Sequence, residues 1–164
     1  LNDNFTEENK KKNFNPKINQ VLINISGFEK SRIFTEQRII QLKDTIKSID
    51  DKIKIVFTSS PESYPILDNL FGKGALTQEE IGKFDIISLI HEMPKFDLVI
   101  SPDTAITHFA SALEMKQIIF FDTIEKYKEW SPDDNNYVAL VGQGDINQIP
   151  IFEFKTALSL IFDS

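Results

Sequence analysis

The chain contains no cysteine, only two histidines and no long hydrophobic run. Without cysteine it forms no disulfide and offers no thiolate to a metal, which is compatible with a cytoplasmic protein. No apolar run approaches the roughly 20 residues of a membrane-spanning helix, and the polar start at residues 1–4 does not resemble a signal peptide. The histidines stand 17 residues apart without paired carboxylates, so the sequence predicts no metal site.

Basic residues are also in the minority, with 18 Lys and Arg against 25 Asp and Glu. The resulting net charge of −7 argues against nonspecific binding to nucleic acid. One tryptophan against 14 phenylalanines indicates that Phe fills much of the core. A hydrophobic content of 41% in 164 residues is typical of one globular domain with a sizeable core.

The first 20 residues differ in composition from the rest of the chain. They are rich in Asn and Lys, and Pro16 argues against a long helix there. We expect residues 1–20 to be a linker or disordered tail and residues 21–164 to be one domain. Because the chain lacks an initiating Met, we expect it to be a piece of a longer protein.

Apolar runs alternate with segments of helical spacing from residue 21 onward. Strands are expected at 21–25, 53–57, 98–100, 118–121 and 137–141, and helices at 36–49, 63–71, 86–93 and 151–162. Thr35 is expected to cap the helix at 36–49, and Asp85 the helix at 86–93. After Pro102, helical spacing puts Ile106, Phe109, Ala110 and Leu113 on one apolar face of a further helix. Strands that alternate with helices across short loops favour an α/β fold: a Rossmann-like parallel sheet with helices on both faces.

The stretch from Ser101 to His108 is the strongest candidate for a site. Pro102 has no backbone donor, so the buried strand should end there, and Asp103 or Thr104 can cap the following helix. A helix start at the carboxyl edge of a sheet suits an anion. Thr104, His108 and Ser111 are spaced to share a polar surface. Alternatively, Asp103 is only a cap and His108 only a half-exposed helix residue.

The segment from Asp97 to Leu113, DLVISPDTAITHFASAL, resembles the nucleotide-sugar signature of the heptosyltransferase family. That signature reads D-hydrophobic-hydrophobic-hydrophobic-x-x-D-T-G-x-x-H-x-A-x-A-L, in lipopolysaccharide-building glycosyltransferases of the GT-B class. Ala105 replaces its glycine, which adds a methyl group to a closely approached backbone. The resemblance covers roughly residues 20–162 and implies the carboxyl-terminal half of a GT-B glycosyltransferase.

In that family, residues matching Asp103 and Thr104 contact the sugar or diphosphate, with Ala105 and His108 beside them. The loop after the first strand keeps Gly27, and the resemblance implies that Lys30 or Arg32 supplies a cation to the diphosphate. The alternative is that both cations are solvated in a surface loop.

Two further residues complete the donor site that the resemblance implies. The loop at 58–62 resembles a family loop whose acidic residue binds ribose hydroxyls, which makes Glu62 the candidate; alternatively Glu62 complements a helix dipole. Phe84 stands where the family packs a residue on adenine, and the alternative is a core position.

One departure from the family pattern opposes this interpretation. Asp122 stands where the family has a turn against the diphosphate, so its charge should weaken nucleotide binding unless the side chain turns away. Trp130-Ser131-Pro132 does keep the family's downstream W-x-P element.

The resemblance implies a donor-binding domain for an ADP-heptose-like nucleotide sugar, in lipopolysaccharide or surface glycan synthesis. It needs no metal or other cofactor, and the catalytic residues are expected in an amino-terminal domain that this chain lacks. The protein would be cytoplasmic, and peripheral to the inner membrane through its acceptor. The first alternative is a non-catalytic nucleotide-binding or structural module, and the second is a transferase for another sugar nucleotide.

Overall fold

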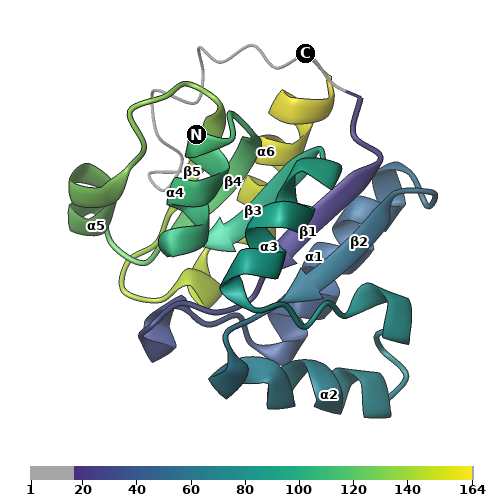
Figure 1. Ribbon diagram of the computed structural model, residues 1–164. Helices are drawn as coiled ribbons and strands as arrows, with labels where there is room; N and C mark the ends of the chain where they lie inside the picture. The colour runs from purple at the N-terminus through teal and green to yellow at the C-terminus, as the bar shows by residue number, and fades with distance from the viewer. Residues whose placement is uncertain (1–16, 164) are drawn as a thin grey trace.

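The computed structural model describes residues 17–163. Within them, five parallel strands form one sheet in the order β2-β1-β3-β4-β5 (Figure 1). The strands are β1 (Gln20–Asn24), β2 (Lys54–Thr58), β3 (Leu98–Pro102), β4 (Lys116–Phe121) and β5 (Tyr137–Val141). The predicted parallel sheet is confirmed: β5 has the predicted bounds, and each of the other strands has one or both ends displaced by one or two residues.

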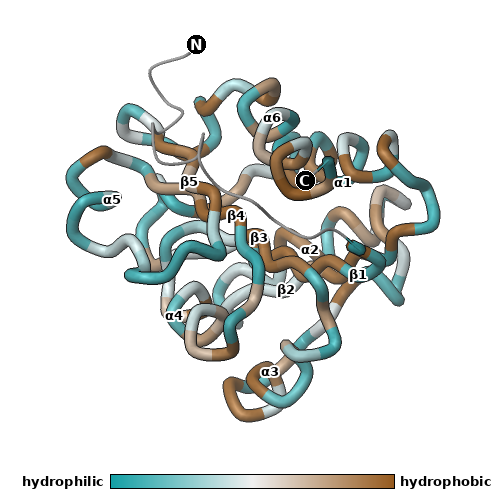
Figure 2. Tube along the Cα trace, turned by 90° about the horizontal axis from the view of Figure 1, so that it is seen from above, coloured by the Kyte–Doolittle hydropathy of each residue, from teal (hydrophilic) through white to brown (hydrophobic). Residues whose placement is uncertain are grey.

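Helices cover both faces of the sheet, as predicted (Figure 2). Viewed along the sheet, α1 (Glu36–Ile49) and α6 (Ile151–Phe162) lie on one side, and α3 (Ile86–Glu92) and α4 (Ala105–Ala112) on the other. The remaining two are α2 (Tyr64–Gly72), which packs on β2, and α5 (Ile124–Trp130), which packs on β4 and β5. None of the helices within residues 17–163 has the length and apolar character needed to cross a bilayer.

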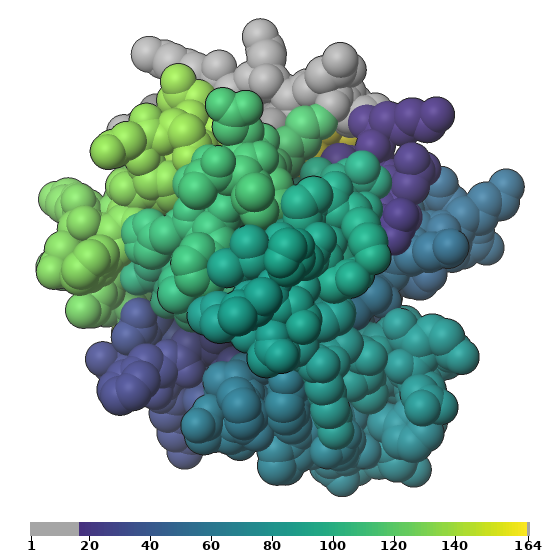
Figure 3. Space-filling model, in the orientation of Figure 1, coloured from purple at the N-terminus to yellow at the C-terminus, as the bar shows by residue number. Residues whose placement is uncertain are grey.

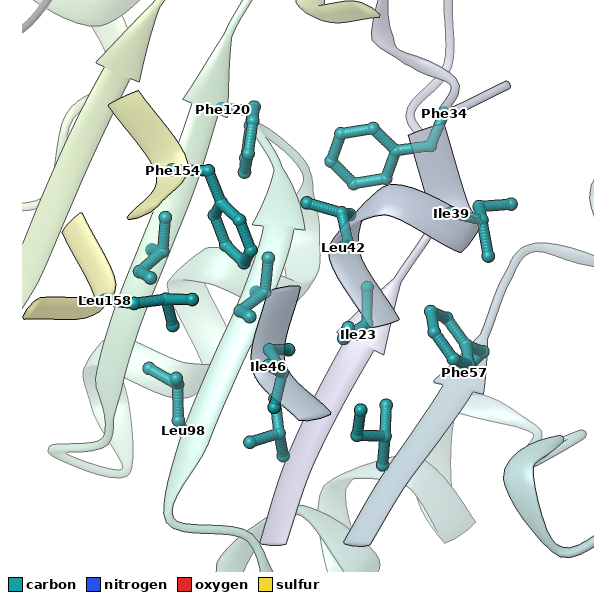
Figure 4. Close-up of a cluster of buried hydrophobic side chains, with 14 of the residues drawn as sticks. Ile23, Phe34, Ile39, Leu42, Ile46, Phe57, Leu98, Phe120, Phe154 and Leu158 are labelled. Atoms are coloured by element: carbon teal, nitrogen blue, oxygen red, sulfur yellow. The ribbon is translucent and has the colours of Figure 1, made fainter. Parts of the chain in front are cut away.

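The larger core lies between the sheet and helices α1 and α6 (Figure 4). Alternate residues of each strand point to this side, such as Ile23 on β1 and Phe120 on β4. Phe120 packs edge-on against Phe34 with ring centroids 5.0 Å apart, and its ring lies 6.0 Å from that of Phe154. Phenylalanine therefore fills the centre of this core, as its abundance predicts.

Polar side chains cap four of the helices, α4 among them. Thr35 caps α1 by accepting a hydrogen bond from the Arg38 amide, and Asp85 does the same for α3 through the Ser88 amide. Both caps were predicted from the sequence. Thr123 caps α5, a helix that the sequence did not predict.

The amino-terminal expectation falls mostly outside the described residues. Residues 1–16 are not described, so a linker there stays a prediction. Ile18 is buried, and Gln20 already pairs with Lys54 of β2. The ordered sheet therefore begins one residue before the predicted boundary at 21.

Candidate functional site

The carboxyl ends of β1, β3 and β4 meet at one edge of the sheet, where polar loops gather. Asn24 at the end of β1 donates a hydrogen bond to the Ser101 hydroxyl of β3, with the two atoms 3.0 Å apart. The Asp103 amide donates to the Phe120 carbonyl of β4, which continues the strand pairing past Pro102. These contacts fix where the segment Ser101–Thr104 leaves the sheet, and ligands bind at this edge in open α/β folds.

Thr104, not Asp103, is the side-chain cap of α4. Its hydroxyl accepts a hydrogen bond from the Ile106 amide at 3.2 Å and lies 3.4 Å from the Ser101 hydroxyl. The Asp103 carboxylate is therefore not used as a helix cap, and the alternative that gave it this role alone is wrong. Ala105 is the exposed first residue of α4, so its methyl group lies at the surface of the helix start.

Asp103 is 4% exposed and pairs with Arg32 from the loop after β1. Arg32 Nη1 lies 3.7 Å from Asp103 Oδ2 and donates to the Asp103 carbonyl at 3.2 Å. Burial raises the pKa of Asp103 above its ordinary value, against the opposing influence of the charges on Arg32, His108 and Lys126. The structure thus brings a buried carboxylate and a cation together at the start of α4.

The loop that carries Arg32 is closed on itself by Gly27. The Gly27 amide donates to the Arg32 carbonyl at 2.7 Å, and a Cβ atom on Gly27 would lie 2.7 Å from Arg32 Cβ. Arg32 also contacts Glu29 at 3.5 Å, whereas Lys30 is exposed at the loop tip. In Figure 3 this loop is the purple surface at the lower left, next to α5. Of the two candidate cations, Arg32 is the one that the fold directs at Asp103.

His108 projects from the exposed side of α4 toward the end of α5. Its ring lies 6.5 Å from that of Trp130, at an interplanar angle of 74°. Ser111, in contrast, accepts a hydrogen bond from Gln117 of β4 and faces the sheet. The prediction that Ser111 shares a polar surface with Thr104 and His108 is therefore wrong. The expected apolar face is also shifted, because Thr107 is buried and Leu113 exposed.

Glu62 and Phe84 lie toward the β2 side of the same edge. Glu62 is exposed in the 3-10 turn Pro61–Ser63 that follows β2. With strands about 4.8 Å apart, the end of β2 is roughly 10 Å from that of β3. Phe84 is half-buried and packs with the smaller core under α3 and α4. That packing agrees with the core alternative for Phe84, and its contact with a base stays a prediction.

Asp122 is buried at the end of β4 and faces the Arg32 loop. It is 4% exposed, and its Oδ2 accepts a hydrogen bond from the Ser31 hydroxyl at 2.8 Å. Its other oxygen, Oδ1, is buried without a hydrogen-bond partner among the described residues. The charge of Asp122 also helps to raise the pKa of Asp103. The charge of Asp122 was evident in the sequence, whereas its hydrogen bond to Ser31, 91 residues away, was not.

Two other residues of this edge were not expected as site residues. Lys126 on α5 places a positive charge close enough to influence the pKa of Asp103. Trp130 was recognised only as part of a W-x-P element, and the structure shows its ring beside His108. A hollow of about 360 Å³ opens at the start of α5, lined by residues 123–125 and 141–144.

No group of three or more Asp, Glu or His side chains within residues 17–163 is arranged to share a metal ion. What the edge does offer is a cation, a helix start and carboxylate acceptors. A cation and a helix start attract an anion, and carboxylates accept hydrogen bonds from hydroxyl groups.

Three solved structures of heptosyltransferases share this fold. E. coli heptosyltransferase WaaC with ADP is 13% identical, with a TM-score of 0.66 over 86% of this chain and 43% of that one. The same enzyme with ADP-2-deoxy-2-fluoro heptose gives a TM-score of 0.64 at 13% identity, over 90% of this chain and 45% of that one. E. coli ADP-heptose lps heptosyltransferase II gives 0.68 at 10% identity, over 87% and 46%. The chain thus spans less than half the length of these proteins.

No curated protein matches the chain in sequence. The family model of glycosyltransferase family 9 (heptosyltransferase), however, matches residues 45–156, which is more than half of the chain and includes the whole of α4. Because it covers more than half of the chain, this match establishes that the chain belongs to glycosyltransferase family 9, the heptosyltransferase family.

Proposed function

We propose that this domain binds the nucleotide sugar of a heptosyltransferase-like reaction, with an ADP-heptose-like donor at the carboxyl edge of the sheet. The observation that carries the proposal is the juxtaposition of Arg32, Asp103 and Thr104 at the start of α4. E. coli heptosyltransferase WaaC, which has the same fold, has been solved with ADP and with ADP-2-deoxy-2-fluoro heptose, and this supports the same class of ligand here.

Arg32, Asp103 and the start of α4, which Thr104 caps, each interact with a different part of the donor. The Arg32 guanidinium offsets the charge of the diphosphate, which becomes the leaving group when the sugar is transferred. The start of α4 adds the positive end of a helix dipole. The Asp103 carboxylate accepts hydrogen bonds from sugar hydroxyls, and His108 and Ala105 lie beside it on α4.

The remaining parts of the proposal concern the whole protein. Glu62 binds the ribose hydroxyls, and Phe84 contacts the base. The catalytic residue and the acceptor site lie in a second, amino-terminal domain, and transfer needs no metal or other cofactor. The product belongs to lipopolysaccharide or another surface glycan, made on the cytoplasmic side of the membrane.

Asp103→Asn tests the proposal in the full-length protein. Because Thr104 caps α4, the substitution should change the free energy of unfolding by well under about 1 kcal/mol. Sugar transfer should fall on the order of 10²-fold, as when one positioned polar contact is removed. Asp68→Asn, on the exposed surface of α2, is the matched control. A fully active Asp103→Asn protein would remove Asp103 from the site.

Titration with ADP, UDP and GDP decides between this proposal and its rivals. ADP should bind the full-length protein in preference to the other two nucleotides. The 164-residue chain alone should bind ADP more weakly than a dissociation constant of about 1 μM and should transfer no sugar, because only half of the cleft is present. Tight binding of UDP or GDP instead would indicate another sugar nucleotide, and no binding by the full-length protein would favour a non-catalytic module.

A further inference from the structure

The loop after β1 has an exposed tip and a closed base. Phe28 at its tip is 96% exposed, and Glu29 and Lys30 are exposed as well. The base of the loop is closed by the bridge between Ser26 and Ile33. Arg32 joins the base to the tip: the Gly27 amide donates to its carbonyl, while its own amide donates to the carbonyl of the tip residue Glu29. The way the tip is held against the sheet therefore also affects where the Arg32 side chain lies.

Ser31 provides that anchor by donating its hydroxyl hydrogen to Asp122 Oδ2 at 2.8 Å, across 91 residues of sequence. Asp122 is itself fixed to the loop that follows β5, because its carbonyl accepts a hydrogen bond from the Gly144 amide at 2.7 Å. The loop tip is thereby tied to the ends of β4 and β5. Arg32, the next residue, then directs its guanidinium to Asp103.

We propose that Asp122 is a positioning residue that acts through Ser31 to hold Arg32 in place for the diphosphate of the donor. The inference rests on the proposed function. It reverses the expectation that Asp122 opposes the ligand, since the carboxylate is covered by the loop and accepts the Ser31 hydrogen bond. A side chain that orients a ligand-binding group in this way contributes to binding without touching the ligand.

The two roles of Asp122 predict opposite signs in one measurement. If its charge simply repels the diphosphate, Asp122→Ala should tighten ADP binding. If it positions Arg32, Asp122→Ala should weaken ADP binding about five- to tenfold, the effect of one lost hydrogen bond. Ser31→Ala should weaken binding to a similar extent. Asp122→Asn keeps an oxygen that accepts from Ser31, so it should retain affinity within about threefold.

The test is calorimetric titration of the full-length protein with ADP, for wild type, these variants and their combinations with Arg32→Met. In the Arg32→Met background, Ser31→Ala and Asp122→Ala should have no further effect, because the group they position is gone. Ser48→Ala, which removes an exposed hydroxyl bonded within α1, is the control and should bind as wild type. Thermal melting shows whether each variant folds. If Asp122→Ala does not fold, Ser31→Ala still tests the proposal, because it removes the same hydrogen bond from the loop side.

The outcomes separate this inference from the function on which it rests. Wild-type protein that binds no ADP overturns the proposed function and the inference with it. If wild type binds ADP and Arg32→Met weakens binding, the function stands. In that case the positioning role alone is overturned if Asp122→Ala and Ser31→Ala bind ADP as tightly as wild type or more tightly. It is also overturned if both substitutions weaken ADP binding as much in the Arg32→Met background as in wild type.

Discussion

Replacing Glu153 by Gln is expected to stabilise the protein at and above neutral pH. Glu153 lies in the first turn of α6, is 1% exposed, and has no hydrogen-bond partner for either carboxylate oxygen among the described residues. Burial raises its pKa from 4.5 to about 7. Glutamine has nearly the same shape and carries no charge, so it avoids the cost of ionising a carboxyl group in this position.

The magnitude follows from the difference between the two pKa values of Glu153. At about 1.4 kcal/mol per pH unit, a pKa of about 7 instead of 4.5 lowers the free energy of unfolding by roughly 3 kcal/mol above pH 7. The substitution also loses the attraction between a carboxylate and the helix start, about 0.3–1 kcal/mol. The net gain is about 2 kcal/mol at pH 8, or a melting temperature higher by about 4–8 °C.

The pH dependence gives the sharper test. The folded protein holds the Glu153 proton more tightly than the unfolded chain does. The stability that this proton contributes is therefore fully present below about pH 4.5 and is lost as the pH rises through 7. Urea unfolding at pH 5 and pH 8 should therefore show a Glu153→Gln advantage that grows with pH. Glu125→Gln, in the exposed first turn of α5, should show no such advantage. A Glu153→Gln protein no more stable than wild type at pH 8, or an advantage independent of pH, would refute the reasoning.

Four further substitutions test other parts of the fold. Gly27→Ala puts a methyl group 2.7 Å from Arg32 Cβ, so the loop must shift; titration should show weaker ADP binding, and unchanged binding would contradict this close packing. Thr104→Ala and Thr35→Ala should each cost about 1 kcal/mol in urea unfolding as lost helix caps. Only the Thr104 change should also weaken ADP binding, and equal effects would remove Thr104 from the site. Phe154→Ala should cost about 3–5 kcal/mol in the same assay, and a smaller loss would show that the core collapses around the cavity.

The sheet was predictable because its strands are short apolar runs buried on both faces. Residues 137–141 and 118–121, for example, are buried throughout. The ends of strands are less clear in sequence, since Gln20 and Lys54 pair with each other at the polar margin of the sheet. Their side chains give no apolar signal, although their backbones continue the ladder. This is why the predicted strands start or end one or two residues away from the observed ones.

Helix α5 escaped prediction for a related reason. It has seven residues, none of them fully buried, so no apolar periodicity marks it. The choice of cap for α4 was equally open in the sequence, because Asp103 and Thr104 are both good capping residues. The structure decides it through β3, which pairs with β4 as far as Pro102 and passes Asp103 before the helix begins.

The motif in the sequence does not show which residues pair with the charges of the candidate site. The motif identified Asp103 and drew attention to Asp122 as a charge in the wrong place. Their neighbours, Arg32 and Ser31, come from a loop 71 and 91 residues away in sequence. A carboxylate next to a free phosphate would repel it. The same carboxylate bound to the loop that carries the cation makes the site depend on that loop, and only the tertiary structure distinguishes the two cases.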